Sequence, residues 1–562
     1  MTKLKKWPWE KSLPSDVNWQ SDIPTYTLPD MFTKSVKQWR NKTAIDFLGK
    51  TLSYEELGFS VNCAAKGLQI NGVVKNSRVG IMLPNCPAYV IMYWATLCAG
   101  GIVVNLNPLY TREELATQIQ DSGIDFLISL DLKELFFKAE SMFQYTQLKK
   151  LIVVSLSKEL PIIKNFLFRI FKQKNLAKFT ISDKIINLNT LIKNDGIYKK
   201  PSIDQDDVAV LQYTGGTTGL PKAAMLTHKN LSANIEQGTL FFPQTEAGKE
   251  VILCVLPLFH VFAMTVVMNF AIRNGGKIVL LPKFDINQML KTIIRTKVTF
   301  FPAVPTIYIA VNNHPNVKSG KMDLSSIKAC LSGGDTLPTE VKEVFEKNTG
   351  CKLVEGYGLS ETSPIAACNP STGESRQGSL GLPAPQTIFE ITSIEDPKKV
   401  LALGDMGEIC ISGPQIMKGY WEKPSETEKA LDGGRFHTGD VGYIDDDGYV
   451  YLIDRIKEVI ISSGYNVYPR YIEEAIYKHS AVEEVTVIGI PDSYRGQSAK
   501  AFVRISEGHD LTPDDLLEFI KDKLSPIECP KEIEFRSELP KTAVGKLSKK
   551  ELIEEIETNT AI

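Results

Sequence analysis

Residues 213–222 combine residue types that can hold a polyphosphate: Tyr-Thr-Gly-Gly-Thr-Thr-Gly-Leu-Pro-Lys. Three glycines let the backbone approach a ligand and turn its N–H groups toward oxygen atoms, while three threonine hydroxyls add donors. Lys222 adds a positive charge. Gly219 lies three residues before Lys222, so this is not a Walker A loop, in which Gly and Lys are adjacent. The segment predicts a phosphate-binding loop; the alternative is a flexible turn.

Residues 355–362, Glu-Gly-Tyr-Gly-Leu-Ser-Glu-Thr, could hold a purine and a metal ion. Tyr357 lies between two glycines and can present its ring face to a base. Glu361 can bind Mg²⁺ beside phosphates, because Mg²⁺ is usually bound by one or two carboxylates together with phosphate oxygens. By itself, this segment would more often be structural.

A ribose site is suggested by Thr438-Gly439-Asp440 together with Asp454-Arg455. A carboxylate can accept hydrogen bonds from both ribose hydroxyls, and Arg455 adds a fork of donors. The alternative is an aspartate in a turn beside a surface ion pair.

Lys546 follows Gly545 in the segment 539–546, Leu-Pro-Lys-Thr-Ala-Val-Gly-Lys. The glycine gives the lysine a mobile backbone that could insert into a site. A lone lysine after a glycine is more often solvated surface.

The elements that must position these residues change in character along the chain. From about residue 40 to 400, short apolar runs alternate with helical stretches, which predicts parallel sheets covered by helices. Thr111 and Glu114 form a capping box that opens one of these helices. Residues 89–104 are the most apolar stretch, but they fall short of the ~20 residues of a membrane helix, so we expect a buried helix followed by a strand.

After about residue 405 the strands become short and closely spaced. We expect strands at 407–412, 441–444 and 449–453, with a turn at 445–448. A compact α+β stretch follows, with helices from Pro469 and at 513–524 and strands at 485–490 and 501–505. We therefore expect an N-terminal domain of residues 1–454 and a C-terminal domain of residues 455–562.

Composition excludes several classes of protein. The chain has 562 residues, 43% of them hydrophobic, and a net charge of -2, so no overall basic field draws it to nucleic acid. The nine cysteines are scattered without a C-x-x-C pair, which predicts reduced thiols in a cytoplasmic protein. The six histidines form no H-x-x-x-H pair, so the spacing does not indicate a histidine-based metal site.

Residues 161–178 form a basic, amphipathic segment. It contains five lysines and arginines, no acidic residue, and many large apolar residues. Such a helix can lie on an anionic membrane, here the inner face of the cytoplasmic membrane. The ordinary interpretation is a surface helix docked on the main domain.

Together, in this order and at these spacings, the four motifs resemble the acyl-adenylate-forming superfamily of acyl-CoA synthetases, luciferases and peptide-synthetase adenylation domains. The resemblance covers about residues 30–555. Residues 256–263, 413–421 and 463–469 are similar to bacterial long-chain fatty-acid–CoA ligases. The resemblance implies an α/β multidomain fold. A large N-terminal part has two helix-covered sheet subdomains and a small β-barrel, and a mobile α+β domain follows it.

The resemblance also implies a role for each matching residue. The residues implied to bind the nucleotide are Thr214, Gly215, Gly216, Thr217, Thr218, Gly219, Tyr357, Gly358, Ser360, Asp440 and Arg455. The residues implied in catalysis are Lys546 for adenylation, Lys222, Glu361, which also binds the metal, and His260 near the acyl site. Asp454 is the implied hinge. A packed core histidine is the alternative for His260. Ile456 and Glu458, beside the hinge, replace the commoner Lys and Asp.

The implied activity uses ATP, Mg²⁺ and CoA to convert a long-chain fatty acid to acyl-adenylate and then acyl-CoA. A fatty acid is ionised at neutral pH, so its activation needs positioning and positive charge but no general base. A medium-chain or aryl acid, or transfer to a carrier protein, stays open, as does a homodimer. From another class, a non-catalytic nucleotide-binding scaffold is argued against by Lys222, Glu361 and Lys546 together.

Overall fold

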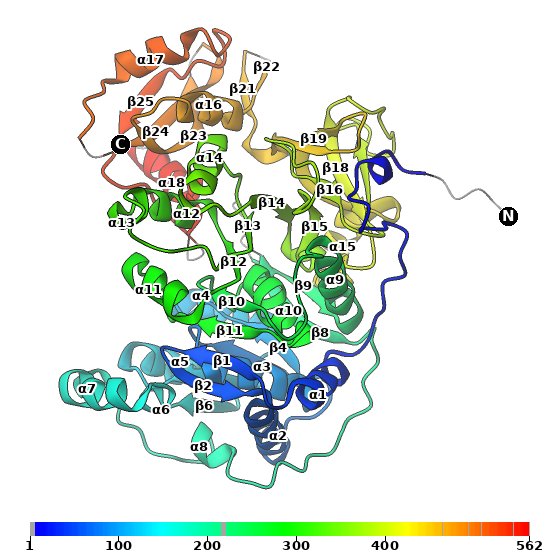
Figure 1. Cartoon of the computed structure of the whole chain (residues 1–562), viewed down its shortest axis with the longest axis vertical. Coiled ribbons are helices and arrows are strands. Elements are labelled where there is room, and N and C mark those ends of the chain that lie inside the picture. Colours follow the sequence, from blue (N-terminus) through cyan, green and yellow to red (C-terminus); the bar gives the residue numbers. More distant parts are fainter. Residues whose placement is uncertain are drawn as a thin grey trace, which may run out of the picture.

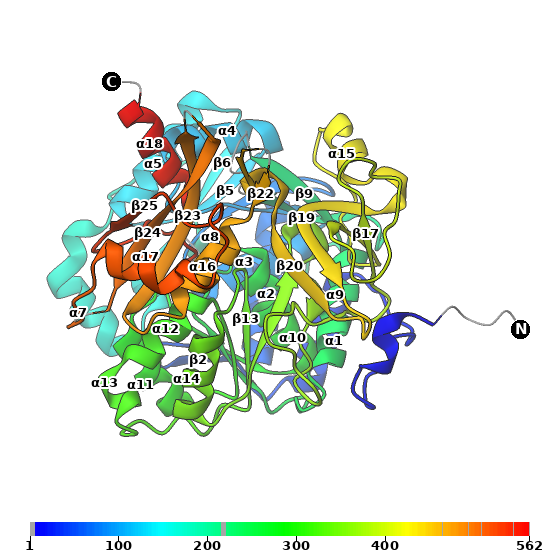
Figure 2. The ribbon, with the colours of Figure 1, turned by 90° about the horizontal axis from the view of Figure 1, so that it is seen from above.

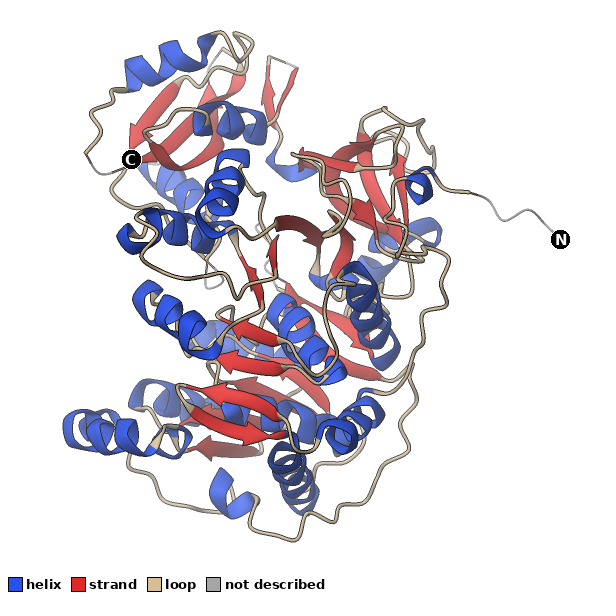
Figure 3. Ribbon diagram, in the orientation of Figure 1, coloured by secondary structure: helices blue, strands red, loops and turns tan. Residues whose placement is uncertain are grey.

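Four sheets and the helices around them make up the chain in this computed structural model (Figure 1, Figure 3). The structure describes residues 6–214, 221–463, 465–492, 494–506, 508–542 and 545–560. Two large sheets lie in the N-terminal part, followed by a small antiparallel sheet and then by the C-terminal α+β part. This is the α/β multidomain fold that the sequence predicts.

The seven-stranded sheet carries the strand that leads into the predicted phosphate loop. Its strands, in spatial order, are β7 (Ile185–Asn187), β6 (Lys150–Val154), β5 (Phe126–Leu130), β3 (Arg78–Met82), β4 (Ile102–Asn105), β8 (Val208–Thr214) and β9 (Lys222–Thr227). Neighbouring strands are parallel except β8 and β9, which form an antiparallel pair with Thr214 opposite Lys222. The sheet therefore places Lys222 at the end of the loop, next to the strand that enters it.

The nine-stranded sheet carries the purine motif near one edge. Its strands, in spatial order, are β16 (Leu382–Pro383), β15 (Ile365–Cys368), β14 (Leu353–Gly358), β13 (Ala329–Gly333), β12 (Phe300–Ala303), β10 (Val251–Cys254), β11 (Lys277–Leu280), β1 (Thr43–Phe47) and β2 (Lys50–Ser53). The strands from β1 to β14 in this order are parallel, and the outer ones are antiparallel. Tyr357 lies at the carboxyl end of β14, where ligands of such sheets usually bind.

A continuous apolar core joins the two large sheets. Its central helix, α3 (Pro87–Cys98), is buried over almost its whole length, because nearly all of its residues are apolar. The hydroxyl of Tyr89 in α3 lies within hydrogen-bond distance of Asn105 Oδ1 in β4 (2.6 Å) and of the carbonyl of Leu258 after β10 (2.9 Å). The expected buried helix and strand at 89–104 are confirmed as α3 and β4.

Further helices cover the two sheets. They are α1 (Leu28–Trp39), α2 (Tyr54–Ile70), α4 (Arg112–Ser122), α5 (Lys133–Tyr145), α6 (Leu156–Glu159), α7 (Ile162–Lys172), α8 (Leu188–Leu191), α9 (His228–Phe241), α10 (Phe270–Asn274), α11 (Ile286–Thr296), α12 (Pro305–Asn313), α13 (Pro315–Lys318) and α14 (Thr339–Thr349). The capping box at Thr111 is confirmed, since its side chain accepts the N–H of Glu114 at the start of α4.

The small antiparallel sheet occupies the position expected of the β-barrel. Its order is β17 (Ile388–Thr392), β18 (Gly407–Ser412), β19 (Phe436–Ile444) and β20 (Val450–Arg455). The predicted turn at 445–448 joins β19 to β20. The sequence pattern did not indicate β17. It also did not indicate the first half of β19, because β19 begins before the alternation of apolar and polar residues does.

The C-terminal part is a separate five-stranded sheet with its own apolar core. The strands are β21 (Ile460–Ser462), β22 (Tyr465–Val467), β23 (Val482–Asp492), β24 (Gly496–Ile505) and β25 (Glu532–Phe535), and the helices are α16 (Pro469–Tyr477), α17 (Pro513–Lys521) and α18 (Lys549–Thr560). The predicted start at Pro469 is confirmed, whereas α17 ends at Lys521, short of residue 524. Seen from above, α16 lies beside β20, with which it is in contact (Figure 2).

Candidate functional site

Three predicted ribose and purine residues meet where β14 approaches the β19–β20 hairpin. Tyr357 donates a hydrogen bond from its hydroxyl to Asp440 Oδ2 (2.5 Å), and Arg455 Nε lies 3.1 Å from Asp440 Oδ1. Asp440 and Arg455 are opposite each other in the strand register. Burial raises the pKa of Asp440, although the positive charge of Arg455 opposes that shift. The hairpin therefore presents a buried carboxylate beside the Tyr357 ring, as an adenosine site requires.

The part of β19 at Thr438-Gly439, where its register with β18 is irregular, is braced by groups that the sequence motifs did not indicate. Glu408 Oε1 accepts the N–H of Gly439 (3.0 Å), and Glu408 Oε2 lies 2.8 Å from His437 Nδ1, which is also 3.3 Å from the Cys410 Sγ. Gly439 has φ 73, a left-handed conformation that favours glycine. These contacts hold the backbone that leads into Asp440.

Glu408, Cys410 and His437 are also close enough together to hold a metal ion, which the histidine spacing gave no reason to expect. Residues this far apart in sequence form no recognisable ligand motif. Their polar atoms already have protein partners, and the charge of Arg435 lies near enough to act on the pKa of Cys410. We therefore interpret the cluster as the support of this irregular part of β19.

Lys222 and Glu361 lie on either side of Tyr420. The Lys222 ammonium lies 5.3 Å from the centre of the Tyr420 ring and is ion-paired with Glu426 of α15 (Pro424–Ala430). The Tyr420 hydroxyl donates to Glu361 Oε1 (2.9 Å). Tyr420 lies in the segment 413–421 that resembles the family, but no motif predicted its contacts with Lys222 and Glu361. No sequence pattern indicated Glu426.

The phosphate loop itself is only partly described. Gly215, Gly216, Thr217, Thr218 and Gly219 lie outside the described residues, so their predicted role stays a prediction. Thr214, at the end of β8, donates from its hydroxyl to the carbonyl of Lys222 (3.3 Å), which ties the two ends of the loop together.

Glu361 offers the kind of ligand that Mg²⁺ requires. Its side chain is buried, and burial raises the pKa of its carboxyl group. Tyr420 orients one carboxylate oxygen, and carboxylate oxygens are the usual protein ligands of Mg²⁺ beside phosphates. Glu361 therefore fits the implied metal.

The neighbours of Glu361 in the same motif are set by backbone packing. Ser360 begins the short 3-10 turn Ser360–Thr362, with its exposed fraction intermediate. At Gly358, an added Cβ would lie 1.9 Å from the carbonyl oxygen of Pro364. The backbone itself therefore requires a glycine at this position, whereas the resemblance implied that Gly358 serves nucleotide binding.

Lys546 reaches this site from the C-terminal part. The carbonyl of Gly545 accepts a hydrogen bond from the Thr306 hydroxyl (2.8 Å), and the Lys546 side chain passes so close to Gly334 that a Cβ there would lie 3.0 Å from its Cε. Burial lowers the pKa of Lys546, and the charge of Asp335 opposes that shift. The lysine therefore lies at the carboxyl end of β13, next to β14, the strand that carries Tyr357.

His260 follows β10 and is half-buried. Burial, together with the charge of Lys546, lowers the pKa of His260 to about 3. Its Nδ1 accepts the N–H of Phe262 (3.4 Å). Its role near the acyl site stays a prediction, with a packed core histidine as the alternative.

Asp454 joins the small sheet to the C-terminal part. Its Oδ2 accepts the backbone N–H of Arg470 at the start of α16 (3.1 Å), and its Oδ1 accepts the N–H of Arg455 (2.7 Å). The Arg470 guanidinium returns a bond to the carbonyl of Leu452 (2.8 Å). The chain thus passes between the two parts at a well-defined contact.

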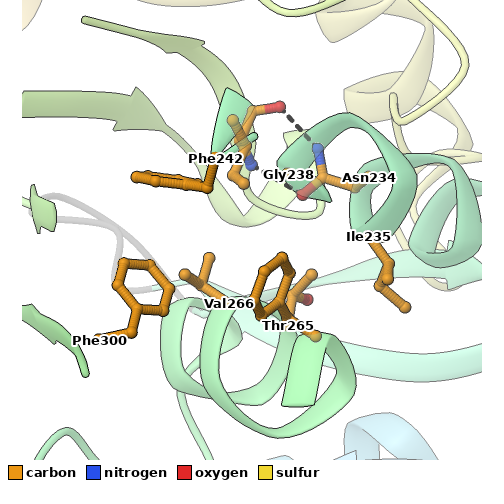
Figure 4. Close-up of a pocket in the computed structure, with 9 residues that line it drawn as sticks. Asn234, Ile235, Gly238, Phe242, Thr265, Val266 and Phe300 are labelled. Atoms are coloured by element: carbon orange, nitrogen blue, oxygen red, sulfur yellow. Dashed lines mark hydrogen bonds between the residues drawn. The ribbon is translucent and has the colours of Figure 1, made fainter. Parts of the chain in front are cut away.

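Several residues that follow His260 in the sequence line a small apolar cavity (Figure 4). It is formed by α9, by β12 and by the π-helix η3 (Ala263–Asn269), and its volume is about 10 Å³. Helices of this kind are rare and often lie at functional sites. Gly238 of α9 lines the cavity without a side chain, and a Cβ there would point toward Ile365 and Phe270.

Comparison with known proteins agrees with this geometry. The sequence profile of the AMP-binding enzyme family matches residues 32–421, and that of the AMP-binding enzyme C-terminal domain matches residues 471–546. The chain is 45% identical to the long-chain-fatty-acid–CoA ligase of Bacillus subtilis over 98% of both chains. It is 35% identical to that of Salmonella typhimurium, over 97% of this chain and 98% of the relative.

A solved structure gives the same result for the fold. ATP-bound MatB from Rhodopseudomonas palustris superposes with a TM-score of 0.82 at 27% identity, covering 94% of this chain and 99% of MatB. The two family profiles include Tyr357 and Lys546, whereas Asp440 and Arg455 fall between the matched ranges. The chain belongs to the AMP-binding enzyme family.

Proposed function

We propose that this enzyme activates a long-chain fatty acid with ATP, releasing pyrophosphate, and then passes the acyl group from the adenylate to CoA, releasing AMP. The observation that carries the proposal is the position of Lys546 against Gly334 at the end of β13, beside the strand whose Tyr357 bonds to Asp440. Similarity to two long-chain-fatty-acid–CoA ligases over nearly the whole chain supports the class of substrate.

The residues of this site suit adenylation. Asp440 would accept hydrogen bonds from the ribose, and the Tyr357 ring would lie against adenine. Lys222 and Lys546 would hold the negative charge that spreads over the phosphate oxygens as the fatty carboxylate attacks the α-phosphorus. Bound Mg²⁺ would supply further positive charge beside the phosphates, held by Glu361. The fatty carboxylate is already ionised, so the neutral His260 is suited to orienting the acyl group without moving a proton.

We propose that the apolar cavity between α9 and η3 is part of the acyl site, which must widen to take a long chain because the cavity holds only about 10 Å³. Its apolar lining suits an alkyl chain, and η3 begins three residues after His260. Gly238→Leu should fill it, because even a Cβ at Gly238 would lie 3.3 Å from Ile365 Cδ1. We expect kcat/KM to fall at least about tenfold for long acids and to change less than about threefold for short ones. An equal loss for all chain lengths would place the acyl chain elsewhere.

The alternatives differ in the acid or the acceptor. A screen of acids from short to long chain, with an aryl acid included, would measure AMP release with and without CoA. We expect release that depends on CoA and rises toward long chains. A preference for the aryl acid, or transfer only to a carrier protein, would replace the proposed substrate. No pyrophosphate exchange with any acid would favour a nucleotide-binding scaffold.

We further propose a domain boundary near Asp454, with residues 455–562 moving between two orientations. The contact between Asp454 and the start of α16 supports a hinge at this position. A cytoplasmic location is supported by the nine cysteines, all of which are free thiols.

We also propose that α7 rests on an anionic membrane surface. Docking on the main domain would have buried its apolar side chains, but Ile162 is 89% exposed, Ile163 75% and Phe166 64%. Lys164, Lys172 and other lysines are exposed near them, and acidic residues are absent from 161–178. An exposed apolar face flanked by positive charge suits lipid headgroups. Among the described residues, no helix is long and apolar enough to cross a membrane.

A further inference from the structure

The helix that follows the loop with Lys546 begins with side-chain charges that are electrostatically unfavourable at a helix N-terminus. α18 starts with two lysines, Lys549 and Lys550, although the N-terminus of a helix already carries partial positive charge. Lys550 is ordinary: its side chain is 61% exposed and pairs with Glu554 one turn later (3.7 Å). Lys549 is different, because its side chain is only 20% exposed.

Two carboxylates hold Lys549. Its Nζ lies 3.0 Å from Glu458 Oε2 and 3.3 Å from Glu473 Oε1. Burial alone would lower the pKa of Lys549, but Glu473, Glu458 and Asp454 outweigh it and raise the pKa above its ordinary value. A buried charge persists only when it is paired in this way.

The two partners belong to different elements. Glu458 lies in the short turn Ile456–Glu458, which directly follows the proposed hinge. Glu473 lies in α16, and its Oε1 also accepts the N–H of Val487 in β23 (2.8 Å). Lys549 therefore ties the start of α18 both to the hinge segment and to the body of the C-terminal sheet.

The loop that carries Lys546 ends at Lys549. This loop is closed by hydrogen bonds from the N–H of Thr542 to the carbonyl of Lys546 (2.8 Å) and from the N–H of Ser548 to the carbonyl of Pro540 (2.8 Å). Its far end enters α18 through Lys549. The position of the Lys546 side chain thus depends on where α18 is fixed.

We propose that Lys549 is a positioning residue for adenylation, which fixes the Lys546 loop relative to the hinge by pairing with Glu458 and Glu473. This inference rests on the proposed role of Lys546. Loss of the ion pairs of Lys549 should displace Lys546 from the phosphate, and a displacement of about 1 Å can lower the rate on the order of 10²-fold. The thioester step does not use Lys546 and should be spared.

The test is a single-turnover measurement of each half-reaction in Lys549→Met. Adenylation is started with ATP and palmitate, and thioester formation with supplied palmitoyl-adenylate and CoA. We expect adenylation to fall at least about tenfold and thioester formation to change less than about twofold. Lys549→Arg, which can keep both ion pairs, should recover most of the adenylation rate.

Lys550→Met is the matched control, because it removes the same charge from the next residue, which is exposed. It should change neither half-reaction by more than about twofold. Equal loss of both steps in Lys549→Met, an unchanged adenylation rate, or the same effect in Lys550→Met would overturn the proposal. Should Lys549→Met fail to fold, Glu458→Gln carries the test, since it removes one pair and keeps the other.

Lys546→Ala separates the two ideas. If it abolishes adenylation while Lys549→Met does not, the role of Lys546 stands and the positioning role of Lys549 is wrong. If Lys546→Ala leaves adenylation intact, the proposed role of Lys546 fails, and the positioning role fails with it.

Discussion

Charged side chains of the proposed site are held by protein groups with which a substrate would have to compete. Lys222 pairs with Glu426, and Tyr420 bonds to Glu361. The Lys222–Glu426 pair is partly exposed, and such pairs contribute only about 0–1 kcal/mol. In the proposed phosphate-binding role of Lys222, phosphate oxygens would therefore displace Glu426 at little cost.

Replacing Glu361 by glutamine should raise the Mg²⁺ concentration needed for half-maximal adenylation and leave the KM for the fatty acid nearly unchanged. Only the ionised carboxylate binds the metal, and burial raises the pKa of Glu361. In the unmodified enzyme, Mg²⁺ affinity should thus weaken as the pH falls through that raised pKa. Titrating Mg²⁺ at several pH values measures both effects.

The Glu361→Gln variant also controls for the protonation of ATP, which itself changes with pH. In this variant, the Mg²⁺ concentration for half-maximal adenylation should change with pH only as much as the protonation of ATP requires. An unshifted Mg²⁺ titration in Glu361→Gln would remove the metal from this residue.

At the scale of elements, short sequence patterns predicted the elements that they specify locally, but no pattern predicted contacts between residues far apart in the sequence. Capping residues, the turn at 445–448 and the apolar run at 89–104 act locally, so α4, the β19–β20 turn and α3 followed from them. The pairs Lys222–Glu426 and Lys549–Glu473 join distant elements, and no spacing indicates them. The amphipathic pattern of α7 was visible, but whether its apolar face would be covered depended on the rest of the chain.

The exposed face of α7 leads to a prediction about lipid. Binding to liposomes should require anionic lipid and fall about a hundredfold when Lys164, Lys172 and Lys174 are changed to glutamine, at about 1 kcal/mol per residue. Ile163→Ser with Phe166→Ser should weaken binding as well. Co-sedimentation with vesicles measures both.

A matched control changes three exposed lysines elsewhere, Lys347, Lys398 and Lys399, to glutamine. This variant should bind as the unmodified protein does. Binding that ignores salt and lipid charge, or an equal loss in the control, would return α7 to the class of ordinary surface helices.

At the scale of the whole molecule, the proposed adenylation lysine lies against the N-terminal part. Gly545 and Lys546 contact Thr306 and Gly334, and the chain crosses between the two parts at Asp454. The proposed second reaction needs space for a thiol at the same place, which is why we propose that the C-terminal part moves. Hinges usually absorb such motion in a few backbone dihedrals at the end of an element, which is where Asp454 lies.

Asp454→Pro should therefore separate the two half-reactions. Proline fixes φ near about -65° and should hold one orientation. We expect adenylation to survive and thioester formation to fall at least about tenfold. Asp454→Ala removes the carboxylate without fixing the backbone, and it should spare the ratio of the two rates. Equal loss of both steps with a lowered melting temperature would mean that proline had disrupted the fold.

The central claim is that Lys546 serves adenylation alone, in the position that the structure gives it. Its most direct test is the single-turnover rate of each half-reaction in Lys546→Ala. We predict that acyl-adenylate formation falls by about 10²–10³ or more, as expected for the loss of one charge contact in the transition state. Thioester formation from supplied acyl-adenylate should remain near the unmodified rate. An equal loss of both half-reactions, or no loss of adenylation, would contradict the account.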